Sequence, residues 1–265
     1  MNFQRANHKL SLLEDFYNCF NEDTRLKRRH GIVEYTTNMK YIHEYLNDDK
    51  TKKILDIGAG TGAYSVPLSN EGYEVHAIEL VQHNLDILNS KKSNVIARQG
   101  NALNLDMYLD NSFDIVLLFG PMYHLLKEEE KIQALKEAQR VCKNTGHIFV
   151  SYYMNDYAII TYGFIKGNIL ESKKKGMVDD AYHVVAQEGD LYSMVRIEDI
   201  DAYNKTVGLR RVKIIASDGA SDYIRTPLNK LPQEAFEEYL KYHLSICERK
   251  DLLGASSHLM DIVQK

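Results

Sequence analysis

The residues best suited to chemistry stand in a glycine-rich turn, Ile54-Leu55-Asp56-Ile57-Gly58-Ala59-Gly60-Thr61-Gly62. An apolar run leads into the glycines, and a helical pattern begins at about Ala63. Glycine lacks a Cβ atom, so the main chain at Gly58 and Gly60 can lie directly against a ligand. The helix that follows offers unpaired N–H groups at its N-terminus. The pattern therefore predicts a ligand-binding turn between a buried strand and a helix.

Two kinds of ligand fit this turn. Gly58, Gly60 and Ala63 satisfy the dinucleotide pattern G-x-G-x-x-A. Glu79, at the end of the next predicted strand, suits a ribose diol in either case. Asp56 favours a different ligand, because a carboxylate beside the turn opposes a pyrophosphate and attracts a positively charged amino group.

Polar and aromatic residues follow the third and fourth predicted strands. Asn101 and Ala102 come after the third strand, where a polar side chain could read the edge of a base. The fourth strand is followed by Phe119-Gly120-Pro121-Met122-Tyr123-His124. The carboxyl ends of parallel strands meet at one edge of an open α/β sheet, so these residues should face the same crevice. Tyr123 and His124 are the candidates for proton removal, and both could instead shape the pocket or pack in the core.

A Rossmann-like α/β fold is predicted to position these residues. Apolar runs indicate strands at 53–57, 74–78, 95–97, 113–119, 147–153, 210–216 and 258–263. Helical patterns separate the first five of them, which favours a mostly parallel sheet with right-handed crossovers and helices on both faces. We expect Gly146 to close the helix that precedes the fifth strand.

The pattern divides the chain into four parts. They are an N-terminal helical cap at 1–47, a cofactor-binding core at 48–154, an insertion that covers the substrate at 155–205, and the completion of the core sheet at 206–265. The first insertion should hold a helix at 157–170 and then a mixed segment rich in Tyr and His. A second helical insertion should separate the last two strands.

Composition excludes several classes of protein. The 33 Lys and Arg against 37 Asp and Glu give a net charge of −4, which opposes a strongly basic nucleic-acid-binding surface. Three scattered cysteines without a CxxC pair favour neither disulfides nor zinc fingers, so no metal site is predicted and a reducing, cytoplasmic location is expected. No segment has the length and apolar character of a membrane span.

Taken together, these residues resemble the class I S-adenosylmethionine-dependent methyltransferases of the bacterial small-molecule type. The resemblance covers about residues 41–153 and rests on the glycine turn, Glu79-Leu80, Phe113-Asp114-Ile115-Val116 and the segment 119–125. It implies a seven-stranded sheet in which strand seven lies antiparallel between strands five and six. It also implies S-adenosyl-L-methionine as the cofactor and S-adenosyl-L-homocysteine as the product.

The resemblance further assigns residues to the site. The implied cofactor-binding residues are Asp56, Gly58, Ala59, Gly60, Gly62, Glu79, Leu80, Asn101, Ala102 and Phe119. Sequence before strand one often forms a lid in this family. The substrate candidates are Arg29, His30 and Tyr35 of that segment, together with Tyr123, His124 and Tyr153. Methyl transfer from a sulfonium chiefly needs orientation, and a base is needed only when the acceptor must lose a proton.

A small molecule is the expected methyl acceptor, given the acidic balance and the absence of an Asn-Pro-Pro-Tyr motif after strand four. Two alternatives stay open at this point. One is an NAD(P)-dependent oxidoreductase. The other is an RNA-modifying methyltransferase that would use 25–29 and 173–175 as basic contact patches.

Overall fold

Seven strands form one sheet in the order β3-β2-β1-β4-β5-β7-β6. The strands are β1 Lys53–Ile57, β2 Glu74–Glu79, β3 Ile96–Gln99, β4 Phe113–Leu118, β5 Cys142–Tyr153, β6 Arg210–Ala216 and β7 His258–Gln264. The first five run parallel, and β7 runs antiparallel to both β5 and β6. The predicted Rossmann-like sheet and the place of its last strand are confirmed. The computed structural model describes residues 12–17 and 26–265.

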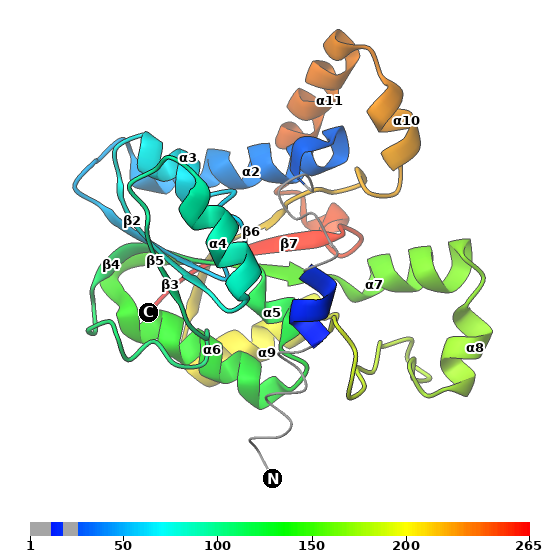
Figure 1. The fold of residues 1–265 in the computed structure, drawn as a ribbon. Helices are drawn as coiled ribbons and strands as arrows, with labels where there is room; N and C mark the ends of the chain where they lie inside the picture. Colours follow the sequence, from blue (N-terminus) through cyan, green and yellow to red (C-terminus); the bar gives the residue numbers. More distant parts are fainter. Residues whose placement is uncertain (1–11, 18–25) are drawn as a thin grey trace.

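Helices cover both faces of the sheet (Figure 1). They are α2 Arg29–Leu46, α3 Ser65–Asn70, α4 Gln82–Ser90, α5 Pro121–His124, α6 Glu128–Val141, α7 Asn155–Ala158, α8 Ile169–Lys174, α9 Ile197–Val207, α10 Arg225–Lys230 and α11 Gln233–Ile246. Residues 12–17 are helical as well. No described helix is long and apolar enough to cross a membrane.

Two apolar layers hold the helices to the sheet. Ile54 of β1 packs with residues of α2 and α3, whereas its neighbour Leu55 faces the layer that contains α6 and α9. Successive side chains of a strand point to opposite faces, so a strand covered on both sides must be apolar throughout. This explains why β1 appears in the sequence as an almost continuous apolar run that ends at the glycine turn.

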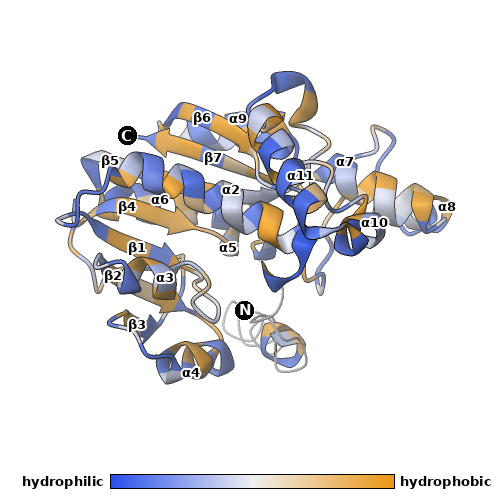
Figure 2. Ribbon diagram, turned by 90° about the horizontal axis from the view of Figure 1, so that it is seen from above, coloured by the Kyte–Doolittle hydropathy of each residue, from blue (hydrophilic) through white to orange (hydrophobic). Residues whose placement is uncertain are grey.

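Two insertions project beyond the carboxyl ends of the parallel strands (Figure 2). The first contains α7, a π-helical segment Ile159–Ile165 and α8, and it follows β5. The second contains α10 and α11 and lies between β6 and β7. Both therefore lie at the edge of the sheet where the predicted site residues are expected.

Three predicted elements differ from the structure. Helix α6 ends at Val141, and Gly146 lies inside β5 rather than at a helix end. The helix expected at 157–170 is divided among α7, the π-helical segment and α8. The segment expected to be mixed contains α9, which packs on the core through Ile200 and Tyr203. Tertiary packing accounts for these differences. At Gly146, a lone glycine in the sequence can mark either the end of a helix or a close approach of two backbone segments.

The close approach at Gly146 generates the first prediction. A Cβ atom there would lie 2.7 Å from the carbonyl oxygen of Asp114 and 2.8 Å from the Sγ of Cys142. Gly146→Ala should therefore lower the free energy of unfolding by about 1–3 kcal/mol, the usual cost of overpacking. Urea denaturation measures the change. Gly254→Ala is the control, because nothing lies within 4 Å of a Cβ atom at that position. Equal stabilities of the two variants would contradict the packing role of Gly146.

Candidate active site

A cavity of about 830 Å³ opens at the carboxyl ends of the parallel strands. The turn after β1 and the residues that follow β2, β3 and β4 form its walls. The helical residues 12–17 and the segment 186–191 also contribute to the lining. Nine of the ten implied cofactor residues line it: Asp56, Gly58, Ala59, Gly60, Glu79, Leu80, Asn101, Ala102 and Phe119.

The glycine turn depends on backbone angles that other residues rarely adopt. The φ angles are 76° at Gly58, 56° at Gly60 and 85° at Gly62. A Cβ atom on Gly58 would lie 2.6 Å from the Cδ of Pro121, so this glycine lets α5 approach the turn. A Cβ atom on Gly62 would lie 2.5 Å from the Cδ1 of Leu88, and Gly62 is not part of the cavity wall. Gly62 thus serves the packing of α4 on the turn.

Glu79 joins the glycine turn to the end of β2. Its Oε2 accepts a hydrogen bond from the N–H of Gly60 at 2.7 Å, and its Oε1 accepts one from the N–H of Val81 at 2.9 Å. Its side chain is 6% exposed, and burial raises the pKa of this carboxyl group. Each carboxylate oxygen has a second lone pair. The group can therefore accept further hydrogen bonds from a ligand diol.

Asp56 lies at the end of β1, beneath the turn. It is 1% exposed and accepts a hydrogen bond from the hydroxyl of Ser65. Burial, with a smaller contribution from the charge of Glu79, raises the pKa of Asp56 to about 7. A positively charged group in the cavity would favour the ionised form of Asp56. The carboxylate of Asp56 can therefore pair with a cationic group of a ligand.

Asn101 and Ala102 follow β3 in a tight turn. The Oδ1 of Asn101 accepts a hydrogen bond from the N–H of Leu103 at 3.0 Å, and its main-chain oxygen accepts one from the N–H of Asn104 at 3.0 Å. These bonds fix the polar side chain at the cavity wall next to buried Ala102.

Tyr123 and His124 of α5 line the same cavity. The Nδ1 of His124 lies 2.9 Å from the carbonyl oxygen of Leu191, and its Nε2 lies 2.8 Å from the hydroxyl of Tyr17. A carbonyl oxygen only accepts, so Nδ1 donates to Leu191, and Nε2 can accept from Tyr17 when the ring is neutral. His124 therefore connects two segments that close the cavity.

Arg29 and His30 are not among the residues that line the cavity. Arg29 donates to the carbonyl oxygen of Leu231, and its guanidinium carbon lies 5.1 Å from the ring centroid of Phe236. The Nδ1 of His30 lies 3.4 Å from the Oδ1 of Asn229. Both residues attach the start of α2 to the insertion that holds α10 and α11.

Tyr35 and Tyr153 are likewise not among the residues that line the cavity. The ring of Tyr35 packs against Tyr64 with centroids 5.5 Å apart, and burial raises the pKa of its hydroxyl. The ring of Tyr153 stacks on His258 with centroids 5.1 Å apart. Their contact with a substrate, like that of Arg29 and His30, stays a prediction.

Several lining residues were not predicted from the sequence. Among them are Tyr17, Glu34, Ser151 and the segment 186–191. Glu34 lies on the buried face of α2, and the available signal was a charged residue among the mostly uncharged residues of that face. The segment 186–191 has no regular pattern, and its place depends on the contact between Leu191 and His124.

The raised pKa of Asp56 predicts a specific pH dependence of stability. A carboxyl group whose pKa is higher in the folded protein contributes stability that is lost as the pH rises, here between about 4 and 7. The loss amounts to as much as about 1.4 kcal/mol per pH unit in that window. Asp56→Asn removes the titration, so urea denaturation from pH 4 to 8 should give the variant the flatter profile. Parallel profiles for the two proteins would contradict the assignment.

A methyltransferase domain model matches residues 55–150 of the chain. The chain is 33% identical over 102 residues to the cypemycin N-terminal methyltransferase of a Streptomyces species, covering 37% of this chain and 41% of that protein. It is 24% identical over 200 residues to the ubiquinone biosynthesis O-methyltransferase of Rickettsia felis, covering 70% of this chain and 76% of that protein. Its fold is similar to that of the CcbJ methyltransferase from Streptomyces caelestis, with a TM-score of 0.58, 15% identity and 95% coverage of both chains.

The chain spans about two fifths of the length of the first relatives that it matches, such as the cypemycin enzyme. The matched segment contains the glycine turn, Glu79, Asn101 and the Tyr123-His124 pair. The strand order, with its antiparallel β7, extends the agreement beyond that segment. Residues 55–150 of the chain therefore match a methyltransferase domain, and the seven strands have the order of the class I methyltransferase fold.

Proposed function

We propose that this protein transfers a methyl group from S-adenosylmethionine to a small molecule that binds in the same cavity. The observation that supports this most is the continuity of the cavity. It extends from the glycine turn, with Asp56 and Glu79, to Tyr123 and His124. In-line displacement requires donor and acceptor to share one space in a fixed orientation.

The residues around the turn fit the methyl donor. When bound, S-adenosylmethionine supplies a methyl group already activated on a sulfonium sulfur. The backbone of Gly60, held by Glu79, would let the donor approach the main chain, and the Glu79 carboxylate would accept from the ribose hydroxyls. Asp56 would face the amino group, and Asn101 with Ala102 would hold the adenine end.

The part of the cavity next to α5 suits a small acceptor. Its walls include Tyr123, His124 and Tyr17 together with apolar side chains such as Leu13 and Leu125. The volume of about 830 Å³ lies within the usual range for small-molecule pockets, about 300–1,000 Å³. The names of the relatives include a glycine/sarcosine N-methyltransferase and an O-methyltransferase, so both acceptor atoms are compatible with the comparisons. The family match and the buried Asp56 carboxylate argue against a dinucleotide-dependent oxidoreductase.

Thermal denaturation with added ligands tests the proposal. S-adenosylhomocysteine should raise the Tm, because a ligand at about 100 times its Kd stabilises the folded state by roughly 2.7 kcal/mol. NAD and NADP at the same concentration should leave the Tm unchanged. A response to NAD without a response to S-adenosylhomocysteine would overturn the proposed function.

His124→Ala tests the role of the acceptor end. Because both ring nitrogens hold segments of the protein, the variant should mainly raise the KM for the acceptor and leave S-adenosylhomocysteine affinity within a few-fold of wild type. A general base would instead contribute about 10²–10⁴ in kcat. Kinetics with an acceptor found by screening amines, phenols and thiols would separate the two roles. Tyr17→Phe, which removes one of the two contacts, should give a smaller effect of the same kind.

A further inference from the structure

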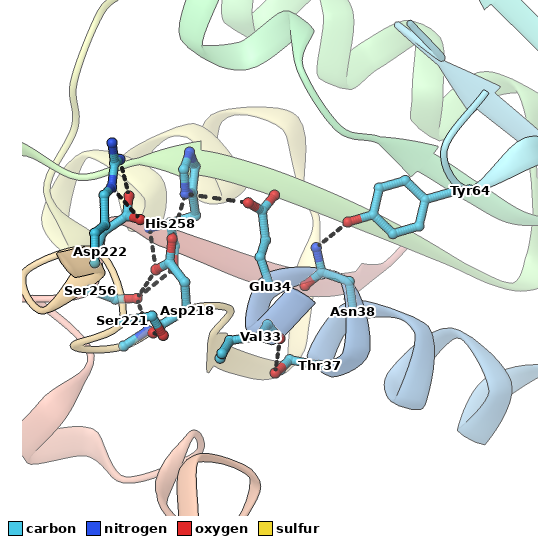
Figure 3. Close-up of polar contacts among 12 residues, drawn as sticks. Val33, Glu34, Thr37, Asn38, Tyr64, Asp218, Ser221, Asp222, Ser256 and His258 are labelled. Atoms are coloured by element: carbon cyan, nitrogen blue, oxygen red, sulfur yellow. Dashed lines mark hydrogen bonds and ion pairs between the residues drawn. The ribbon is translucent and has the colours of Figure 1, made fainter. Parts of the chain in front are cut away.

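Three side chains from distant parts of the chain meet beside the cavity (Figure 3). They are Glu34 of α2, Asp218 after β6 and His258 at the start of β7. The Nδ1 of His258 lies 2.7 Å from the Oδ2 of Asp218 and 3.9 Å from the Oε2 of Glu34. One carboxylate oxygen of Glu34, one of Asp218 and one ring nitrogen of His258 all lie within 4.8 Å of one another.

The sheet topology explains why this cluster lies at the cavity. β6 is antiparallel to β7, and β7 is antiparallel to β5, so β6 ends at the same edge as the first five strands. Asp218 follows the end of β6 by two residues. β7 runs in the opposite direction, so its first residue, His258, begins at this edge and pairs with Tyr153, the last residue of β5.

Asp218 and His258 form a rigid pair. The Oδ1 of Asp218 accepts hydrogen bonds from the hydroxyl of Ser256 at 2.7 Å and from the main-chain N–H of His258 at 2.9 Å. Its Oδ2 accepts from the Nδ1–H of His258, and the imidazole stacks on Tyr153. The ring is therefore held in place with its Nδ1 side toward Glu34.

Glu34 belongs to both the cluster and the cavity. Its side chain is 8% exposed and lines the cavity wall. Asn38, one helical turn further along α2, donates from its Nδ2 to the hydroxyl of Tyr64 at 2.9 Å, and Tyr64 also lines the cavity. This face of α2 therefore brings a buried carboxylate to the cavity between aromatic residues.

The described lining of the cavity is strongly acidic. Within the described residues, the lining contains one lysine, Lys127. Its acidic residues are Glu34, Asp56, Glu79, Glu129, Glu130, Glu188 and Asp190. Tyr17, Tyr64 and Tyr123 add aromatic rings to the same walls. Carboxylates next to aromatic rings are the surroundings that favour an ammonium group, through charge-assisted hydrogen bonds and cation–π contacts.

We propose that the methyl acceptor is an amine, bound as an ammonium ion beside Glu34, an inference that rests on the proposed function. Its nitrogen gives one proton to the Glu34 carboxylate, which frees a lone pair. That lone pair forms the new N–C bond as the C–S bond breaks, and the electron pair of the C–S bond stays on sulfur. The products are neutral S-adenosylhomocysteine and a methylated ammonium ion, and Glu34 returns its proton to water.

Asp218 and His258 act in this scheme as positioning residues. The Nδ1–H of His258 donates to Asp218 and faces Glu34 at 3.9 Å, so it offers a nearby positive potential when Glu34 is ionised. Buried carboxylates are stable only where opposite charge or hydrogen bonds compensate them. The pair thereby holds the Glu34 carboxylate in its place at the cavity wall.

Calorimetry on the full chain saturated with S-adenosylhomocysteine, in buffer with EDTA, tests the inference. The probes are tyramine, phenethylamine and butylamine, each matched with a neutral alcohol: tyrosol, phenethyl alcohol and butanol. At least one amine should bind tenfold or more tightly than its alcohol, a difference of about 1.4 kcal/mol. Glu34→Gln should remove most of that preference, and Glu34→Asp should retain part of it. Glu44→Gln, on the exposed side of the same helix, should keep it in full.

The outcomes separate the two proposals. Absence of S-adenosylhomocysteine binding overturns the proposed function. Normal binding of S-adenosylhomocysteine with no amine bound more tightly than its alcohol, or with an undiminished preference in Glu34→Gln, overturns the amine inference alone. An amine preference that appears only when Zn²⁺ or Mn²⁺ replaces EDTA would identify Glu34, Asp218 and His258 as metal ligands and would also overturn it.

Discussion

The hydrogen bonds that Gly60 and Val81 donate to Glu79 are the interaction on which the site depends. They join the turn after β1 to the end of β2 and hold it in left-handed backbone angles. Pro121 can approach this turn because Gly58 has no side chain, and α5 then brings Tyr123 and His124 to the same cavity. One buried carboxylate thus holds the turn against which α5 packs.

Local sequence patterns predicted the core well because each core strand is buried on both faces. β1 was predicted at its observed bounds, and β7 was placed correctly between β5 and β6 through the family resemblance. The glycine turn and the residues after β2, β3 and β4 could be grouped because parallel strands share one edge. These contacts need only the strand order and no knowledge of the insertions.

The remaining part of the site could not be predicted because it depends on contacts between distant segments. Asp218 and His258 are separated by α10 and α11, and neither belongs to a recognisable motif. Glu34 is hidden in a helix whose other buried residues are mostly apolar or small. Arg29 and His30 carry groups that suit a binding site, yet their position on α2 directs them to the second insertion. A charged residue in a helical pattern indicates that its side chain has an interaction, but the pattern does not show which distant segment supplies the partner.

The reversed direction of β7 also determines how the protein can be handled in the laboratory. The strand begins at the cavity with His258 and then runs away from it over seven residues, roughly 20 Å. The last residues therefore lie at the opposite edge of the sheet (Figure 1). A fluorophore or an immobilising linker attached to Lys265 would leave the mouth of the cavity accessible. The same group attached near Leu12, whose side chain lines the cavity, would obstruct it.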